Sequence, residues 1–392
     1  MMAHTASEPP APGPSSAIVA GMLACFVGFG GAVPVVLAAA AAVGATQAQT
    51  ASWVCGLCIA IALSTGYLSW RYRKPIVTAW STPGAAVIAA TGGTVAIDAA
   101  VGAFVVTALL ILVTSTFKPL ADLINRLPMP IASAMLAGVL FRFVADVALA
   151  VPHQPVLVLA MIAVFLVVRL YNAMAAALAA LAAGVVVAGL TGGLATGRFV
   201  WVASGFEPVL PRFDPAVLVG LALPLYLVTM ASQNLPGFAV LRGHGYEPPV
   251  RPILAVTGLV SLLTAPLGAH TSNLAAISAA ICTGPDCHPD PARRWIAGLS
   301  NAACYATLAV LGGSVVAVFA VLPKALIATV AGLALIGAMV SALAGALAED
   351  RSRFAATVAF ATTASGVAIA GIGAPFWGLV AGLAVLALER VR

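Results

Sequence analysis

The sequence predicts an all-α integral membrane protein with about 14 transmembrane segments in a 7+7 inverted repeat. Of its 392 residues, 62% are hydrophobic and 8% are charged, whereas soluble domains carry roughly 25% charged residues. Apolar runs long enough to cross a bilayer recur along almost the whole chain. A polar phrase that opens an Ala-rich segment at residues 79–90 also returns at 269–280. These observations together predict a multi-pass protein with two related halves.

Residues 1–15 are polar and rich in proline, which predicts a disordered N-terminal tail. Twelve apolar runs follow, and two further segments cross the membrane although Ser, Thr, Pro and Asn interrupt them. The predicted spans are 16–42, 51–69, 75–92, 98–117, 130–150, 155–168, 172–190, 214–235, 252–266, 266–284, 296–320, 324–347, 354–371 and 374–388.

The distribution of basic residues predicts the orientation. If both termini are cytoplasmic, 14 of the 18 Lys and Arg residues lie in or beside cytoplasmic loops, three lie outside and Arg142 lies within a span. This asymmetry is the positive-inside pattern of a multi-pass membrane protein. The net charge of +6 therefore indicates membrane orientation, and no nucleic-acid partner is expected.

Two pairs of similar phrases, each about 190 residues apart, divide the chain into a first repeat at 16–190, an outer loop at 191–213 and a second repeat at 214–392. One pair is the polar phrase, and the other is Leu127-Pro128 matched by Leu322-Pro323. Because each repeat has seven spans, an odd number, the two halves insert with opposite topology. Chance similarity between Ala-rich helices is the alternative.

Spans three and ten are predicted to be broken, each into a short strand and a half-helix. In span three, residues 75–80 would be extended, Ser81 would be the N-cap and Pro83 would open the helix. In span ten, residues 266–271 would be extended and Ser272 would be the N-cap. Both helix N-termini would then meet near the midplane and favour a bound carboxylate. Two Ser/Thr/Pro kinks without a ligand are the alternative.

Polar and aromatic side chains at this depth are the candidate substrate-binding residues. They are Phe29, Trp80, Ser81, Thr82, Pro83, Gly84, Tyr226, Gln233, Asn234, His270, Thr271, Ser272 and Asn273. Phe29 and Tyr226 are equally compatible with packing roles.

Two residues are candidates for proton coupling. His270 is the only histidine inside a predicted span, and its side chain titrates in a suitable range. A neutral histidine hydrogen-bonded in the core is the alternative. Asp98 opens span four and could relay protons, although a carboxylate that stabilises a helix N-terminus explains it as well. Arg142 and Asp146, four residues apart, are expected to form an ion pair.

Neither an enzyme, a cofactor nor a metal site is expected. Cys55 and Cys58 have the spacing of a redox or metal motif, but they lie in an apolar helix without further ligands nearby. HExxH, GxSxG and paired carboxylates at one membrane depth are absent from the sequence.

Several phrases resemble the signature of the benzoate/proton symporter (BenE) family. They are Arg71-Tyr72-Arg73-x-Pro75 with Thr78 to Ala85, Asn234 to Gly237, Gly268 to His270 with Asn273 to Ile277, and His288 to Pro291 with Arg293-Arg294-Trp295. The resemblance covers residues 16–388 and implies a bacterial inner-membrane carrier that imports benzoate with a proton.

The layout is more distantly similar to the uracil permease and anion-exchanger fold. That likeness implies a core domain (16–117 and 214–320), a gate domain (118–190 and 321–392) and a substrate between spans 3, 8 and 10. Nucleobase carriers have glutamates in spans eight and ten, where this chain has Ser232, Gln233, Ser272 and Asn273. An anionic substrate explains the difference, because a fixed negative charge would repel it. Related folds often dimerise, so a homodimer is a further candidate assembly.

The sequence thus predicts a secondary active transporter of benzoate or a similar aromatic carboxylate, with the lipid bilayer and protons as its other partners. An uncoupled or channel-like anion pathway, or a carrier of another small organic anion, is the alternative.

Overall fold

The computed structural model describes residues 15–117, 128–173, 175–193, 203–275, 277–369 and 372–391. The predicted tail, apart from Ser15, lies outside these residues, as does part of the predicted outer loop. In the described part of the chain, eight helices are long and apolar enough to cross a membrane, and three shorter apolar helices accompany them. This confirms an all-α membrane protein.

The first half of the chain contains α1 (Ser15–Ala42), α2 (Gln47–Tyr72), the strand β1 (Thr78–Trp80), α3 (Thr82–Ala89), α4 (Ile97–Thr116), α6 (Met129–Ala150), α7 (Pro155–Tyr171) and α8 (Ala176–Leu190). Helix α2 begins at a capping box, in which the Thr46 side chain and the Gln49 side chain each accept a backbone N–H of the other residue. Its left-handed C-cap, Arg73, ends the helix before the extended segment.

The second half begins with one long helix that changes its winding twice. It consists of α9 (Pro215–Val217), the π-helical turn η1 (Leu218–Ala222), α10 (Leu223–Thr229), a second π-helical turn η2 (Met230–Asn234) and α11 (Leu235–Gly243). The predicted end of this span at residue 235 is therefore wrong. Pro236 has no N–H to donate, but it lies at the start of α11 directly after a π turn, where the hydrogen-bond ladder is already interrupted.

The chain continues through α12 (Val250–Thr264), η3 (Ala265–Leu267), the strand β2 (Ser272–Leu274), α13 (Ile277–Thr283), η4 (Pro291–Arg293), α14 (Trp295–Ala320), α15 (Lys324–Ala346), η5 (Asp350–Ser352), α16 (Arg353–Ala364) and α17 (Ala374–Val391). Helix α16 stops at Ala364, earlier than the predicted 371, because Gly366 adopts a left-handed φ of 69°.

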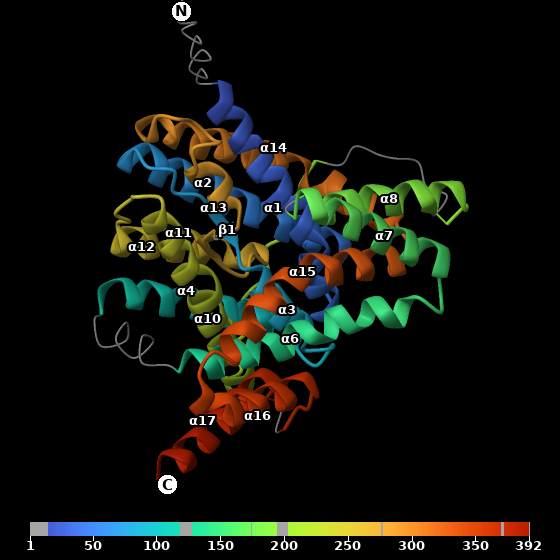
Figure 1. Ribbon diagram of the computed structural model, residues 1–392, viewed down its shortest axis with the longest axis vertical. Helices are drawn as coiled ribbons and strands as arrows, with labels where there is room; N and C mark the ends of the chain where they lie inside the picture. Colours follow the sequence, from blue (N-terminus) through green and yellow to red (C-terminus); the bar gives the residue numbers. More distant parts are fainter. Residues whose placement is uncertain are drawn as a thin grey trace, which may run out of the picture.

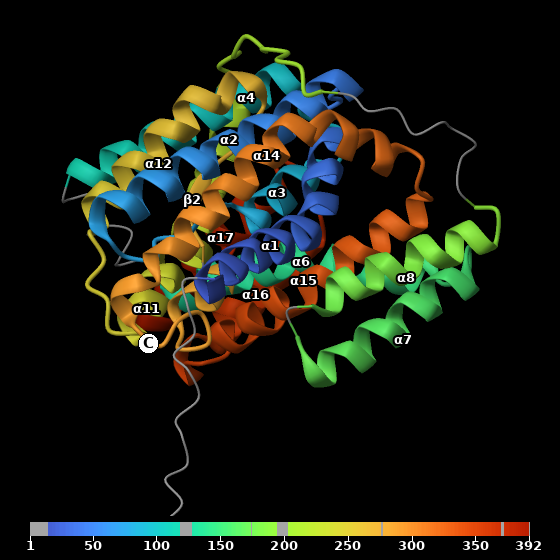
Figure 2. The same ribbon diagram turned by 90° about the horizontal axis from the view of Figure 1, so that it is seen from above.

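Helix packing follows the pattern that an inverted repeat requires. Helix α2 packs on α14, and its counterpart α12 packs on α4; α7 packs on α8, and α16 packs on α17. Helices α6 and α15, which are counterparts of each other, also pack extensively on each other. Figure 2 shows α2, α4, α12 and α14 on one side, α7, α8 and α15 on the other, and α1 and α3 between them. Exchanging the two halves therefore reproduces these contacts.

Candidate substrate cavity between two crossed, broken helices

The two broken segments meet at the centre of the molecule (Figure 1). Strands β1 and β2 pair antiparallel, with Ala79 opposite Asn273. Two flanking backbone bonds extend the pairing, from Ser81 N to Thr271 O (3.2 Å) and from Ala275 N to Val77 O (2.9 Å). Each strand leads into a short helix, α3 or α13. The predicted design of a strand followed by a half-helix is therefore present in both spans.

The predicted start of the first half-helix is confirmed, and that of the second is wrong. Ser81 caps α3, because its Oγ accepts the backbone N–H of Gly84 at 3.0 Å. Residues 272–274, by contrast, form β2, so α13 begins at Ile277 and Ser272 cannot be its N-cap. The backbone N–H of Ser272 instead donates to Ser261 Oγ at 2.7 Å. Pairing with β1 satisfies this segment and delays the helix.

A central cavity of about 410 Å³ lies where these two helices begin. Its first wall comes from α1, the start of α3, the start of α13 and Tyr305 of α14. Its second wall comes from Phe165 and Arg169 of α7, from Ala177 of α8 and from residues 333–335, 337 and 338 of α15. The cavity thus separates the two groups of helices seen in Figure 2.

Four of the predicted substrate-binding residues line this cavity: Trp80, Thr82, Pro83 and Gln233. Gln233 belongs to the π turn η2, and such turns are frequent at functional sites. Trp80 and Tyr305 meet edge to face, with ring centroids 5.9 Å apart and planes at 85°. Phe29 does not line the cavity, but its ring packs on both aromatic side chains, with its centroid 5.7 Å from that of Trp80 and 6.4 Å from that of Tyr305.

The other predicted residues hold the crossing together. Asn234 Oδ1 accepts the backbone N–H of Leu274 at 2.9 Å, which ties η2 to β2. Thr271 Oγ1 lies 3.3 Å from Thr229 Oγ1 of α10. Gly84 packs so closely on Leu225 that an added Cβ would lie 2.6 Å from Leu225 Cδ1.

Three further predicted residues are also buried away from the cavity. Tyr226 is hydrogen-bonded to Thr114 of α4. The Nδ2 of Asn273 donates to Leu274 O at 3.0 Å. Ser272 Oγ and Asn273 Oδ1 are buried without a hydrogen-bond partner among the described residues.

His270 is fully buried and makes two hydrogen bonds. The indole N–H of Trp53 donates to its Nδ1 at 3.2 Å, and its Nε2 lies 3.0 Å from the Ser81 carbonyl oxygen. Because Trp53 can only donate and the carbonyl can only accept, these contacts assign the neutral tautomer with hydrogen on Nε2. A proton on Nδ1 would face the indole N–H. The geometry therefore favours a structural role for this side chain.

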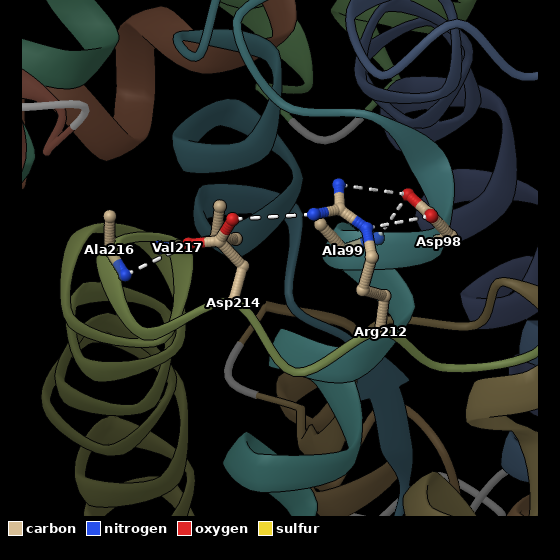
Figure 3. A network of polar contacts seen from close by, with 6 residues as sticks. All are labelled: Asp98, Ala99, Arg212, Asp214, Ala216 and Val217. Atoms are coloured by element: carbon tan, nitrogen blue, oxygen red, sulfur yellow. Dashed lines mark hydrogen bonds and ion pairs between the residues drawn. The ribbon is translucent and has the colours of Figure 1, made fainter.

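Asp98 lies in an exposed network (Figure 3). Arg212 contacts Asp98 at 2.8 Å and Asp214 at 3.3 Å, while Asp214 Oδ1 accepts the backbone N–H groups of Ala216 and Val217. Asp214 thereby caps the long helix of the second half. This arrangement gives Asp98 a structural partner outside the central cavity.

The network belongs to a longer element, residues 203–214, which we call the strap. Its backbone or side chains bond to the carbonyls of Val310 (α14) and Pro266 (η3), to Ser52 Oγ of α2 and to the carbonyl of Asp98 in α4. The strap therefore fastens four elements of one helix group to one another.

Sequence reasoning missed three polar residues that line the cavity: Arg169, Ser278 and Tyr305. The sequence indicates only that Arg169 lies beside a predicted cytoplasmic loop, and Tyr305 lies in a helix without any break. Ser278 was within reach of prediction, because it opens the second half-helix once the strand is placed correctly. Arg169 is the only charged side chain that lines the cavity in the described ranges.

An apolar multi-pass protein whose central cavity is built from two broken helices of opposite repeats has the architecture of a secondary transporter. The sequence matches the BenE family, benzoate membrane transport protein, over residues 11–388. The chain therefore belongs to the BenE family of benzoate membrane transport proteins, a family of transporters and not of enzymes.

Two curated proteins are similar over nearly their whole length. Inner membrane protein YdcO of Escherichia coli is 38% identical over 374 residues, covering 94% of each chain. The benzoate membrane transport protein of Acinetobacter baylyi is 34% identical over 368 residues, covering 94% of this chain and 93% of that protein.

Solved structures at lower identity show the same fold. The transmembrane domain of a cyanobacterial bicarbonate transporter, BicA, matches with a TM-score of 0.59 and 15% identity, covering 96% of this chain and 98% of that domain. SLC26A9 matches with a TM-score of 0.64 and 12% identity, covering 95% of this chain and 65% of that one. The fold is thus that of the SLC26 and BicA transporters.

Proposed function

We propose that this protein imports benzoate or a similar aromatic carboxylate together with a proton, by alternating access across the bacterial inner membrane. The observation that carries the proposal is the central cavity, which combines aromatic walls, hydroxyl and amide groups and a single arginine. Its volume of about 410 Å³ falls within the range of roughly 300–1,000 Å³ that is usual for small-molecule sites.

The aromatic ring of the substrate would contact Trp80 and Tyr305. Both side chains are almost fully buried, and they already pack edge to face on each other and on Phe29. A planar ring adds a further partner to such a cluster with geometry that aromatic pairs favour.

The carboxylate would lie near the starts of α3 and α13, where Thr82 and Ser278 line the cavity. In α3 the N–H of Gly84 is already taken by Ser81, and Pro83 has no N–H. The hydrogen-bond donors at this end of α3 are therefore chiefly the hydroxyl group and the backbone N–H of Thr82. Because no Asp or Glu of the described ranges lines the cavity, nothing there opposes an anion.

Alternating access would move two bodies relative to each other. We assign residues 16–117 and 214–320 to a core domain, which supplies the first wall of the cavity. Residues 118–190 and 321–392 form the gate domain, which supplies the second wall. Fourteen crossings with both termini cytoplasmic complete the proposed topology, and tags at the two termini that react only from the cytoplasmic side would support it.

Uptake of radiolabelled benzoate into proteoliposomes tests the transport claim. Neutral benzoic acid diffuses through lipid, so protein-free liposomes supply the baseline. We expect saturable, protein-dependent uptake that an outside-acid pH gradient increases, that excess unlabelled benzoate abolishes and that benzamide leaves unchanged. Equal uptake with and without protein would contradict the proposal.

An uncoupled anion pathway is the second candidate, because His270 and Asp98 both have structural partners. It predicts protein-dependent benzoate flux that follows the membrane potential and ignores the pH gradient. Counterflow, in which unlabelled benzoate inside the vesicles drives uptake of the labelled compound, would distinguish a carrier from a channel.

A further inference from the structure

A second cavity, of about 220 Å³, lies at the opposite end of α3 from the central cavity. Thr82 and Pro83, at the start of α3, line the central cavity, whereas Val87 and Thr91, at and just beyond its end, line the second one. The half-helix α3 therefore separates the two cavities along its own axis. Like the central cavity, the second one is lined by both proposed domains: η1 belongs to the core domain, and α6 and α17 belong to the gate domain.

Arg142 of α6 is the only charged side chain that lines the second cavity in the described ranges. The expected ion pair with Asp146 does not form, since the two side chains do not approach within 4.0 Å, and Asp146 does not line the cavity. The guanidinium group instead lies over Gly366, where an added Cβ would be 2.3 Å from Arg142 Nη1. Asp146 lies one helical turn from Arg142 and interacts with it electrostatically, but without a direct ion pair. An arginine within a membrane span that forms no ion pair in the described part of the chain is a candidate for binding an anion.

No carboxylate of the described ranges lines the second cavity. Val217 lines the second cavity, and Asp214 caps its backbone N–H at 3.3 Å. Arg212 bridges Asp214 and Asp98, as Figure 3 shows, so its single positive charge offsets part of their negative charge from outside the cavity. Arg142 forms no such ion pair, although Asp146 interacts with it at longer range.

Tight packing between the two helix groups closes the second cavity on one side. An added Cβ at Gly220 would lie 3.0 Å from the Cα of Ile372 and 3.2 Å from the backbone nitrogen of Gly373. Gly220 belongs to η1, and residues 372–373 precede α17. A separation of the two groups at this contact would widen the second cavity without breaking a helix.

We propose that the second cavity is an anion-binding vestibule at the opposite end of the transport pathway, where Arg142 binds the carboxylate of the aromatic substrate. In this view the gate domain supplies one arginine to each cavity, Arg169 to the central cavity and Arg142 to the vestibule. The proposal rests on the proposed function for the identity of the anion. Under the predicted topology the vestibule faces away from the cytoplasm.

Protection of an introduced cysteine tests this proposal. Ala368 lines the second cavity and is exposed, so Ala368→Cys places a thiol at its rim. The rate of maleimide labelling is measured in detergent at increasing benzoate concentration, and protein without the introduced cysteine gives the background. We expect benzoate, and not benzamide, to slow the labelling.

Second substitutions in the Ala368→Cys protein assign the protection to Arg142. Arg142→Gln should raise the half-protective benzoate concentration at least about tenfold, which corresponds to about 1.4 kcal/mol. Arg142→Lys, which keeps the charge, should change it by less than about threefold, and Asp146→Asn, which removes the neighbouring negative charge on the same helix, should not raise it.

Two results would overturn the proposal that the vestibule binds the substrate through Arg142. One is absence of protection in Ala368→Cys protein that still performs benzoate counterflow. The other is protection that Arg142→Gln leaves unchanged. Absence of counterflow in the parent protein would instead refute the proposed function, and protection by benzoate that depends on Arg142 would then still support an anion site at this position. Counterflow by the Arg142→Gln protein also shows that this variant is folded.

Discussion

Arg169 illustrates how one residue acquires a function from its surroundings. In the sequence it is one of many basic residues near predicted cytoplasmic loops, but the structure places it at the cavity that Trp80 and Thr82 line. We expect Arg169→Gln to raise the benzoate concentration for half-maximal counterflow about tenfold, because a charged hydrogen bond is worth roughly 1.5–3 kcal/mol. Arg242→Gln, which removes a charge at the end of α11 outside the cavity, is the matched control. Equal effects of both substitutions would contradict a local role for Arg169.

His270 makes the opposite point, since its chemistry suggests a proton carrier and its contacts suggest a structural residue. We expect His270→Gln to lower the free energy of unfolding by roughly 1–3 kcal/mol, the usual cost of an unsatisfied buried polar group. The remaining transport should keep its dependence on the pH gradient. Trp53→Phe removes one of the same hydrogen bonds and should act similarly in thermal unfolding. Counterflow that persists while the gradient dependence disappears would show that His270 carries the proton.

Residue chemistry alone predicted part of the lining of the central cavity. Trp80, Thr82, Pro83 and Gln233 were predictable because polar or aromatic side chains beside a helix break stand out in an apolar span. Tyr305 and Arg169 were not, because each becomes part of the cavity only when α14 and α7 pack around the crossing. Asn234 and Ser272 were also candidates for substrate contact, but neither lines the central cavity. Asn234 Oδ1 instead accepts the backbone N–H of Leu274, and the backbone N–H of Ser272 donates to Ser261, contacts that no local pattern indicates.

At the scale of elements, the crossing of β1 and β2 fixes where the two half-helices begin. Local chemistry predicted the start of α3, because Ser81 and Pro83 are standard residues for a helix N-terminus. It could not predict the start of α13, because pairing of Ser272 to Leu274 with a strand almost 200 residues away replaces the local N-cap. Most long apolar helices were predicted to within a few residues, since their length is set by the bilayer. The exceptions are the helix interrupted by π turns, which continues to Gly243, and α16, which ends at Ala364.

Gly237 supports the crossing from α11. An added Cβ would lie 2.7 Å from Leu274 Cγ and 2.9 Å from the carbonyl oxygen of Ala275, which lines the cavity. We expect Gly237→Ala to lower the free energy of unfolding by about 1–3 kcal/mol through overpacking and to weaken benzoate binding. Gly243→Ala is the control, because open space surrounds that position in the same helix. Thermal unfolding and counterflow measure both effects, and equal behaviour of the two variants would contradict the assigned contact.

At the scale of the whole molecule, the strap and the cavities support the proposed movement of two helix groups, the core and gate domains, relative to each other. The strap fastens α2, α4, η3 and α14 together, while the central cavity and the second cavity both lie between the groups. Charge asymmetry and the repeated phrases predicted two halves, but these patterns do not show that each half contributes helices to both groups; only the resemblance to the uracil permease and anion-exchanger fold implied that division. That arrangement depends on contacts such as α2 with α14, which join the two repeats.

Asp98 tests the role of the strap. Its ion pair with Arg212 is about half exposed and lies outside the central cavity. Neutralising the Asp98 carboxylate should therefore have a small effect on stability. We expect Asp98→Asn to retain the dependence of benzoate uptake on the pH gradient, and Arg212→Gln to behave alike because it removes the same pair. Loss of the gradient dependence in Asp98→Asn alone, with counterflow intact, would identify Asp98 as a proton relay.

The central claim is that an aromatic carboxylate binds between the two helix groups at the crossing of the broken helices. A structure determined with bound benzoate tests it most directly. The account predicts a ring against Trp80 and Tyr305, with its carboxylate toward Thr82 and Ser278 and within reach of Arg169. A benzoate molecule bound elsewhere with this cavity unoccupied, or one whose carboxylate points away from both half-helices, would contradict it.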